Sequence, residues 1–418
     1  MACTAEMLDR ALASGGRWVE FRHGEEPPNY FAGPFVSHRL AKLAAQEGVD
    51  PSNASQLPYM PETLWRWTPP ASAPHTCALQ PVTHCAFCRA MSSLGLSRMV
   101  SVGDSLQWHM SMSLHFLLMA SNASVMRTIE KGVDRVWSVH ELDCGKYGVP
   151  NVRMERIRSD LLDVHPQEIR GANGARYATL CRHRTTSTVE DKNICHPFMQ
   201  PYATGNASTL LFVNIGAHVH SHALFTQSVD AFFEGLHGVA AGHQRDFSRD
   251  QIILRTTAPG HENCSDAQRP LSEPPIIPSK YDWDKIPAYN EAVRRPPVDS
   301  VTPLAHSCSW IRPWVAAPAA DHRAHHSQAR ERLHNATSVL PMGLHVLDVA
   351  PMTTLRPDGH AGIALHLDMR PFAQPDCLHY SLPGVPDWWN AALVALLCAI
   401  GPACSHHHHQ CSASVDGD

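Results

Sequence analysis

The stretch Ser97-Arg-Met-Val-Ser-Val-Gly-Asp-Ser-Leu106 joins a short apolar run to a glycine, an aspartate and a serine. Beyond it, apolar side chains recur at helical spacing, at Leu106, Met110, Leu114, Leu117 and Leu118. The pattern predicts a buried strand that ends at Gly103, a sharp turn, and a helix that begins near Ser105. Such a turn exposes a serine hydroxyl beside free backbone N–H groups.

Other apolar runs of strand length recur along the chain, at Val133 to Val139, Leu210 to Gly216, Gln251 to Thr257 and Leu344 to Ala350. Helical patterns such as Ser228 to Val239 fall between some of them. Alternating strands and helices predict an α/β fold with a mainly parallel sheet that is covered on both faces. In such sheets the reacting groups collect at the carboxyl ends of the strands.

The chain divides into regions of different composition. Residues 1–90 are rich in Pro, Gly and Trp and have no sustained helical or strand period, so we expect a loop-rich N-terminal module. Residues 91–401 carry the strand and helix patterns, interrupted at 296–332 by a proline-rich insertion. Their last apolar run, Ala391 to Ile400, is too short to cross a bilayer and predicts a buried helix. Residues 402–418 are expected to form a disordered tail that contains His406 to His409, to which we assign no function.

Composition excludes several classes of protein. The 418 residues are 44% hydrophobic and 17% charged, so neither a disordered acidic chain nor a highly charged binding protein fits. Lys plus Arg number 34 against 39 Asp plus Glu, and the net charge of -5 leaves no excess of cations to neutralise a phosphate backbone. We therefore expect a folded globular protein with no nucleic-acid partner.

Cysteine usage favours an oxidising compartment. Most of the 13 cysteines are scattered singly, which suits disulfides, and the odd total leaves at least one thiol free or paired outside the chain. Glycosylation sequons are also frequent, at Asn53, Asn122, Asn206, Asn263 and Asn335. Both features predict a secretory lumen. Residues 1–18 hold no apolar stretch long enough for a signal peptide or an anchor, so we expect the targeting segment to be missing or to lie elsewhere.

Two patterns admit a metal ion as an alternative. One has the spacing of half a zinc site, at Cys77, His84, Cys85 and Cys88, but no second Cys-x-x-Cys motif accompanies it. The other is an alternation of histidines that would share one face of an extended segment, at His218, His220 and His222. No acidic residue lies beside these histidines in the sequence. We predict no bound metal and no bound cofactor.

Two separated segments hold groups suited to nucleophilic catalysis. Gly103-Asp104-Ser105 places a serine at a helix start, although a plain Ser or Asp helix cap is the simpler interpretation. Asp376 and His379 are three residues apart, so the carboxylate can orient one ring nitrogen while the other faces a serine. The alternative is that Asp376 merely starts a turn and His379 is an interior histidine. Spacing alone leaves both interpretations open.

Two further strand ends carry polar groups. Asn214 and Gly216 end one predicted strand, where an amide side chain and a backbone N–H can donate to a developing oxyanion. Arg255 lies near the end of another, where it either holds a carboxylate or braces the sheet. Both strand ends are expected at the edge of the sheet where Ser105 lies.

Several ordered motifs resemble the trichome birefringence-like family, with its PC-esterase, GDSL/SGNH-type acyl-transfer domain. They span most of the chain and are Trp65-Arg-Trp67, Val102-Gly-Asp-Ser-Leu106, Asn214-Ile-Gly-Ala-His218, Arg255-Thr-Thr-Ala-Pro-Gly-His261, Tyr281-Asp-Trp283, Leu355-Arg-Pro-Asp-Gly-His360 and Asp376-Cys-Leu-His-Tyr-Ser-Leu-Pro-Gly-Val-Pro-Asp-Trp388. The last string is the most specific. Cys3 and Gly16-Arg-Trp-Val19 are also similar to the start of that family's N-terminal module.

The resemblance implies a flavodoxin-like SGNH fold, which is a three-layer sandwich, and an acyl-enzyme mechanism. The family's plant members are Golgi type II membrane proteins that O-acetylate cell-wall polysaccharides such as xylan, mannan or pectin. By motif position, the resemblance implies that Ser105 is the nucleophile, His379 the base and Asp376 the residue that orients it. Further candidates for oxyanion or substrate contacts are Gly103, Asp104, Asn214 and Gly216.

Two positions depart from the family's pattern. Trp108 stands where the family usually has an arginine that helps at the oxyanion site, so a cation is lost there. The neighbouring His109 is the candidate to replace it. Tyr380 and Ser381 stand where the family tends to have a cysteine, which puts the usual disulfide to this loop in question.

We predict a polysaccharide O-acetyltransferase in which Ser105, deprotonated by His379, passes an acetyl group from a donor co-substrate to a sugar hydroxyl. An acetylesterase with the same residues is the first alternative, because the outcome depends on whether bound sugar excludes water. The second alternative is a catalytically silent carbohydrate-binding protein in which Trp65, Trp67 and Trp108 stack on sugar rings. The acceptor glycan and the acetyl donor are not determined by these motifs.

Overall fold

A computed structural model describes residues 3–13, 15–22, 64–74, 77–120, 123–131, 137–170, 176–182, 193–241, 245, 247–294, 343–362 and 375–401. The predicted insertion at 296–332 and the predicted tail at 402–418 lie outside these residues, as do His406 to His409.

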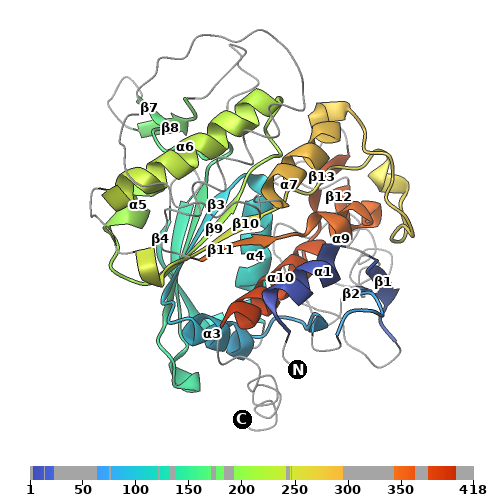
Figure 1. Ribbon diagram of the computed structural model, residues 1–418, viewed down its shortest axis with the longest axis horizontal. Helices are drawn as coiled ribbons and strands as arrows, with labels where there is room; N and C mark the ends of the chain where they lie inside the picture. The colour runs from blue at the N-terminus through green and yellow to red at the C-terminus, as the bar shows by residue number, and fades with distance from the viewer. Residues whose placement is uncertain are drawn as a thin grey trace, which may run out of the picture.

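The described residues build a seven-stranded sheet in the order β11-β10-β9-β3-β6-β5-β4 (Figure 1). The strands are β11 (Gly343–Leu347), β10 (Gln251–Arg255), β9 (Thr209–Asn214), β3 (Arg98–Gly103), β6 (Val152–Arg158), β5 (Trp137–Leu142) and β4 (Met126–Lys131). The strands from β11 to β6 run parallel, and β5 and β4 extend the sheet antiparallel. The predicted mainly parallel sheet is confirmed.

Alternate residues of the central strands face two different hydrophobic cores. Leu210 and Phe212 belong to one core, whereas Leu211 and Val213 belong to the other. The first core also holds α4 (Ser105–Met119), α10 (Val385–Ile400) and α3 (His84–Ser93). The second holds α6 (His222–Ala241), α7 (Ile286–Arg294) and α5 (Met199–Thr204). Helices thus cover both faces of the sheet, which gives the expected three-layer α/β sandwich (Figure 1).

The strand β6 was not predicted from the sequence, because its charged residues interrupt the continuous apolar run expected of a central parallel strand. Its buried Glu155 accepts two hydrogen bonds from the Arg98 guanidinium, at 2.7 and 2.9 Å, and one from Arg153 at 2.8 Å. These charge-assisted bonds offset the cost of burying a carboxylate inside the sheet. For the expected strand at 133–139, the structure describes β5 from Trp137 onward.

The N-terminal region contains more regular structure than expected. It includes α1 (Ala5–Ala13) and an antiparallel pair of strands, β1 (Arg17–Glu20) and β2 (Trp65–Thr68). The helix α3 crosses residue 90 and packs on α4 and α10 in the first core. The predicted loop-rich N-terminal module thus includes two helices in its described part, which packing against α10 stabilises.

The remaining strands pair locally, β7 (Gln167–Arg170) with β8 (Arg176–Leu180) and β12 (His360–Gly362) with β13 (Asp376–Tyr380). A short helix, α9 (Ala350–Thr354), follows β11. Single-turn 3₁₀ segments lie at Ala123–Val125, Gly145–Tyr147, Phe247–Arg249, Cys264–Asp266 and Pro357–Gly359, and a longer one lies at Lys280–Lys285.

The predicted buried helix is confirmed as the C-terminal part of α10. In the described ranges we find no helix with the length and hydrophobicity needed to cross a bilayer.

Disulfides link segments that are far apart in the sequence, as the scattered cysteines predicted. Four pairs are Cys3–Cys77, Cys88–Cys144, Cys181–Cys195 and Cys264–Cys377, and Cys85 and Cys398 are also disulfide-bonded.

Candidate active site

Ser105 is the first residue of α4, directly after the central strand β3. Gly103 makes this sharp junction possible because a Cβ there would lie 2.8 Å from the Asn214 carbonyl oxygen and 2.8 Å from the Gln107 side chain. Its own carbonyl accepts a hydrogen bond from the Ser159 N–H at 2.8 Å. Gly103 is thus a close-packing position, and the structure gives it no donor toward a substrate.

Asp104 is fully buried and caps the helix α4. Its Oδ1 accepts the N–H of Leu106 at 2.9 Å and of Gln107 at 3.4 Å, and its Oδ2 accepts the N–H of Ala217 at 3.1 Å. The simpler interpretation as a helix cap is therefore correct for Asp104. A contact between this carboxylate and substrate is contradicted, because the side chain has no exposed surface and its oxygens are engaged.

The structure brings Asp376 and His379 of β13 to Ser105. His379 Nε2 lies 2.7 Å from Ser105 Oγ, and His379 Nδ1 lies 2.7 Å from Asp376 Oδ2. Asp376 Oδ1 also accepts the N–H groups of Leu378 and His379, at 3.1 and 3.0 Å. A carboxylate, an imidazole and a hydroxyl thus form one hydrogen-bonded chain.

Electrostatics fix the charge state at one end of this chain. Burial by itself raises the pKa of the Asp376 carboxyl, but the adjacent His379 ring and the two N–H donors outweigh it and hold the pKa well below its usual value. Asp376 is therefore an acceptor that keeps the His379 Nδ1 proton in place and leaves Nε2 to face Ser105. The His379 side chain is 26% exposed, so solvent-borne molecules reach it.

Long-range links hold the segment that carries Asp376 and His379. Cys377 forms a disulfide with Cys264, and its carbonyl accepts the His261 N–H at 3.0 Å. The Tyr380 hydroxyl donates to the Pro259 carbonyl at 3.3 Å. A disulfide to this loop was in question because Tyr380 and Ser381 replace the family's cysteine. The structure answers that question, because Cys377 supplies the covalent link.

His109 packs against His379, and its surroundings disfavour the charged form of its ring. The two rings lie 4.9 Å apart at 30°, and His109 Nδ1 lies 3.2 Å from the Tyr380 carbonyl. Burial, and then repulsion by His379, lower the pKa of His109 to about 3. A His109 ring with so low a pKa would replace the family's arginine as a neutral hydrogen-bond donor and not as a cation.

The positive charge near Trp108 comes instead from β6. The Arg156 guanidinium carbon lies 3.5 Å from the centre of the Trp108 ring, although burial lowers the pKa of Arg156 to about 9. Arg158, which pairs with Gly103 across β3 and β6, binds Asp160 at 2.9 Å. These arginines were missed because β6 itself was missed. The alternation of these arginines with apolar residues in the sequence is the signal that could have predicted the strand.

Asn214 and Gly216 end β9 beside Ser105, but their roles differ from those expected. The Asn214 amide donates to the Arg255 carbonyl at 3.2 Å and to Thr257 Oγ1 at 2.7 Å. Both amide hydrogens are used, which contradicts an oxyanion role for the Asn214 side chain. Gly216 packs against Thr257, whose Oγ1 would lie 2.6 Å from an added Cβ. In the part of the chain that the structure describes, the N–H groups of Ser105 and Gly216 donate to no protein group.

Arg255 braces the sheet, which was one of its two proposed roles. Its Nε donates to Gln107 Oε1 at 2.8 Å, one terminal nitrogen donates to the Thr256 carbonyl at 3.1 Å, and the guanidinium lies over the Trp389 ring at 4.9 Å. Burial lowers the pKa of Arg255 to about 10. The guanidinium thus ties β10 to both α4 and α10.

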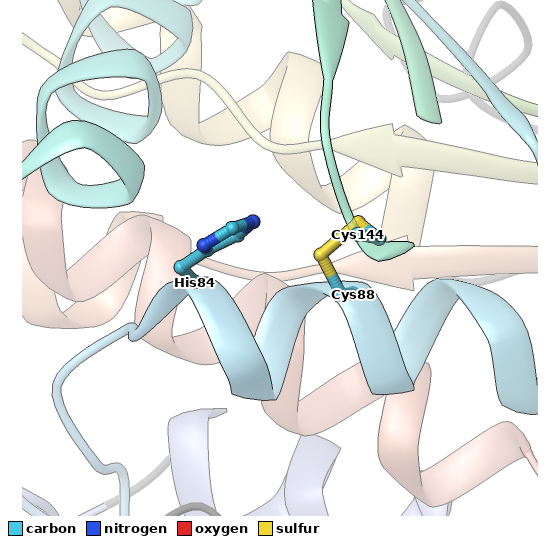
Figure 2. A group of neighbouring side chains, drawn as sticks. All are labelled: His84, Cys88 and Cys144. Atoms are coloured by element: carbon cyan, nitrogen blue, oxygen red, sulfur yellow. A yellow bond between two sulfur atoms is a disulfide. The ribbon is translucent and has the colours of Figure 1, made fainter. Parts of the chain in front are cut away.

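The cysteines of the proposed half zinc site are oxidised. Figure 2 shows His84 beside the Cys88–Cys144 disulfide, and Cys77 is bonded to Cys3. A sulfur in a disulfide is not the thiolate that zinc requires. His84 Nε2 contacts the Asp143 carbonyl at 2.7 Å instead.

The histidines at 218, 220 and 222 do not share a face. The segment turns after β9 instead of continuing extended, and α6 begins at His222. His220 Nδ1 binds Asp282 at 3.0 Å, whereas the His222 ring packs on Tyr289. Asp282 is the acidic neighbour that the sequence did not reveal, but the three rings do not converge.

The tryptophans proposed as sugar platforms serve packing. Trp67 is buried and contacts the Trp18 ring edge to face at 5.7 Å. Trp65 lies against the first core, and Trp108 is covered by Arg156 on one face. Trp65 and Trp108 are partly exposed, so burial excludes Trp67 alone of the three as a sugar platform.

Part of the chain is similar to a known protein family. Residues 216–396 match the model described as PC-Esterase, a GDSL/SGNH-like acyl-esterase family found in Pmr5 and Cas1p. The match covers less than half of the chain. It includes Asp376 and His379 and begins beyond Ser105.

Short segments also match curated relatives. One is 44% identical over 59 residues to xyloglucan O-acetyltransferase 1 of Arabidopsis thaliana, 13% of this chain and 14% of that protein. Another is 37% identical over 70 residues to xylan O-acetyltransferase 2 of Oryza sativa subsp. japonica. It covers 15% of this chain and 14% of that protein. A third is 37% identical over 67 residues to protein trichome berefringence-like 7 of Arabidopsis thaliana. It covers 16% of this chain and 14% of that protein. The chain thus spans 14% of the length of these relatives.

Proposed function

We propose that this chain is a polysaccharide O-acetyltransferase of the trichome birefringence-like family that works through an acetylated serine. The match of residues 216–396 to the PC-Esterase model and the similar segments of named O-acetyltransferases support the proposal. The observation that carries the proposal is the His379 ring, which contacts Ser105 and Asp376 at 2.7 Å each. Two of the matched relatives are named as xyloglucan and xylan O-acetyltransferases, which supports a cell-wall polysaccharide as the acceptor.

In the first half of the reaction, His379 Nε2 takes the proton of Ser105 Oγ while Oγ attacks the carbonyl carbon of the acetyl donor. The negative charge moves to the carbonyl oxygen. Protonated His379 then gives its proton to the leaving group, and Ser105 keeps the acetyl group as an ester. Asp376 stabilises the imidazolium that forms and keeps the ring oriented.

The N–H groups of Ser105 and Gly216 are our candidates for the oxyanion donors. Ser105 is the first residue of α4, where backbone N–H groups have no partner within the helix. Gly216 precedes Ala217, whose N–H is bonded to Asp104 beside the serine. Two preorganised donors of this kind each contribute about 2.7–4 kcal/mol to catalysis in other acyl-transfer enzymes.

In the second half, a sugar hydroxyl attacks the acetyl group and gives its proton to His379 Nε2. The bond to Ser105 Oγ breaks, and His379 returns the proton to Oγ. The same residues hydrolyse the ester if water reaches it first. An acetylesterase is the second candidate function, because the matching family model is described as an acyl-esterase family.

The proposed location is a secretory lumen such as that of the Golgi. The disulfides support an oxidising compartment. Two predicted glycosylation sites, Asn206 and Asn263, lie exposed on the surface, where a glycan fits.

The test uses 4-nitrophenyl acetate as the acetyl donor and xylo-oligosaccharides and xyloglucan oligosaccharides as acceptors. We expect the wild-type protein to gain the mass of one acetyl group on the peptide that holds Ser105 and to produce acetylated sugar. Ser105→Ala should abolish both products while its circular dichroism spectrum stays unchanged.

Ser111→Ala is the matched control, because Ser111 lies on the same helix with its hydroxyl bonded to Ser101 and to the Gln107 carbonyl. It should retain acetyl transfer. Free acetate as the only product in the presence of abundant acceptor would show an esterase. Equal activity of Ser105→Ala and wild type would overturn the proposal.

A further inference from the structure

Behind the candidate site, two buried histidines link two backbone carbonyl groups. His261 lies in the segment after β10, and His360 begins β12. His261 Nε2 lies 2.8 Å from the Thr354 carbonyl oxygen, and His261 Nδ1 lies 2.6 Å from His360 Nε2. His360 Nδ1 lies 3.1 Å from the carbonyl oxygen of His379. The chain of contacts therefore ends at the residue whose ring faces Ser105.

The number of protons in this chain follows from the nature of its ends. A carbonyl oxygen only accepts hydrogen bonds, so His261 Nε2 and His360 Nδ1 must each carry a proton to donate to it. Two neutral imidazoles hold only these two protons. His261 Nδ1 and His360 Nε2 would then face each other at 2.6 Å with a lone pair on each nitrogen. Such a contact is repulsive, whereas a proton between the two nitrogens makes it a short, charge-assisted hydrogen bond.

We propose that His261 and His360 share a third proton and carry a single positive charge together, and that this charged pair positions the main chain at His379. With three protons, each of the three contacts is a hydrogen bond. The pair acts through the backbone of His379 and does not touch Ser105, so its members are positioning residues. The proton count is independent of the proposed function, but its effect on acetyl transfer rests on that function.

The charges around the pair are compatible with one added proton and oppose a second. The titratable groups that face it are Asp358, which is bound to Arg356, and Asp376, His379 and Tyr380 of β13. The carboxylates of Asp358 and Asp376 favour a positive charge on the pair. Burial lowers the pKa of both His261 and His360, and repulsion between the two rings lowers that of His360 further, so both rings are not charged at once.

The packing of His360 explains how the pair acts on His379. The His360 ring stacks on Tyr380 at 4.3 Å, and His360 pairs with Tyr380 across β12 and β13. The Ser381 N–H donates to the Gly359 carbonyl at 2.9 Å. When the shared proton leaves as the pH rises, one of the three bonds is lost and this side of β13 loosens. The rate of acetyl transfer should therefore decline on the alkaline side of the pH at which the pair loses this proton.

Neutron diffraction from crystals of the whole chain in heavy water tests the proton count directly. We expect deuterium on His261 Nε2, on His360 Nδ1, and between His261 Nδ1 and His360 Nε2. Deuterium on only two of the four ring nitrogens would overturn the proposal, whatever the activity of the protein.

A kinetic test uses His360→Gln and His261→Gln. The Gln variants lack the shared proton, so kcat with 4-nitrophenyl acetate should fall about 10–100-fold through misplacement of His379, with KM little changed. The alkaline decline should disappear from the remaining activity. The matched control is His84→Gln, because His84 is also a buried histidine with a lowered pKa that contacts a backbone carbonyl, but it lies at the opposite end of the sheet. If kcat of both His261→Gln and His360→Gln declined with rising pH as it does in the wild type, the positioning role would be contradicted.

Discussion

The two sides of the candidate active site are held in different ways. The serine arm, residues 103–106, is fixed by its own secondary structure: β3 ends at Gly103, Asp104 caps α4, and Ser105 follows. The histidine arm, residues 376–381, includes the short strand β13, which among the described strands pairs with β12 alone. It depends on the Cys264–Cys377 disulfide and on contacts with distant loops. The difference indicates that the nucleophile is placed locally and that the base is placed by tertiary links.

The largest effect should follow from Asp376→Asn in the histidine arm. An amide stabilises no imidazolium and allows the wrong tautomer of His379, so kcat should fall by about 10⁴-fold. The His379 and Leu378 backbone donors keep an acceptor at Oδ1, so folding should persist. The measurement is initial-rate kinetics with 4-nitrophenyl acetate. A loss smaller than about tenfold would show that Asp376 does not orient the base.

The same variant tests the charge of Asp376. Because the folded protein holds the pKa of Asp376 below its usual value, the ionised form stabilises the fold at pH values above about 3.9. This contribution is lost as the pH falls through the acidic range. Asp376→Asn should therefore lose less stability between neutral and acidic pH than the wild type does. Urea unfolding at several pH values measures the difference.

A smaller effect on activity should follow from removal of the Cys264–Cys377 disulfide by Cys264→Ser with Cys377→Ser. The bond closes a loop with a sequence separation of 113, so its loss should cost about 2–5 kcal/mol of stability. Because this bond holds the histidine arm, kcat should fall as well. Urea unfolding and kinetics measure the two effects.

The matched control removes the Cys88–Cys144 disulfide. Cys144 follows Leu142, which pairs with the start of β6 at the end of the sheet opposite to Ser105. Its loss should lower stability by a similar amount and leave kcat close to that of the wild type. Equal losses of kcat in both double variants would contradict the distinction between the two arms.

The smallest effect is expected in the serine arm, from Asp104→Ala. The variant loses the cap of α4 and the bond to the Ala217 N–H, which should cost about 1–2 kcal/mol. Asp104→Asn keeps a cap oxygen at Oδ1, so it should lose less stability than Asp104→Ala does. Thermal unfolding measures both. If Asp104→Ala destabilised the protein more than the loss of the Cys264–Cys377 bond, the serine arm would not be the locally fixed one.

The strands that the sequence predicted share one property. The strands β3, β9 and β10 are almost continuous apolar runs because both of their faces are buried. The parallel strand β6 escaped prediction because its charged residues obscure the pattern. Glu155 is tolerated inside the sheet because Arg98 from β3 and Arg153 from β6 itself bind it. No local signal reveals a partner that lies 57 residues away.

Within the candidate site, the sequence predicted which residues take part better than it predicted their protonation and their contacts. Ser105, Asp376 and His379 were found as motifs, and the structure places them in contact. The lowered pKa of His109 was not predictable, because it results from burial and from the neighbouring His379 ring. The stacking of Arg156 on Trp108 was equally hidden, since it joins α4 to an unpredicted strand.

The sequence by itself determined the strand, the glycine turn and the helix that present Ser105, and the spacing that lets Asp376 bind His379. Both depend on backbone geometry over a few residues. Only the tertiary structure decided that these segments meet across 274 residues, that Cys377 holds the second one, and that two histidines stand behind it. The physical reason is that charge states and long-range contacts depend on which groups are buried together, and burial is set by the packing of the whole sheet.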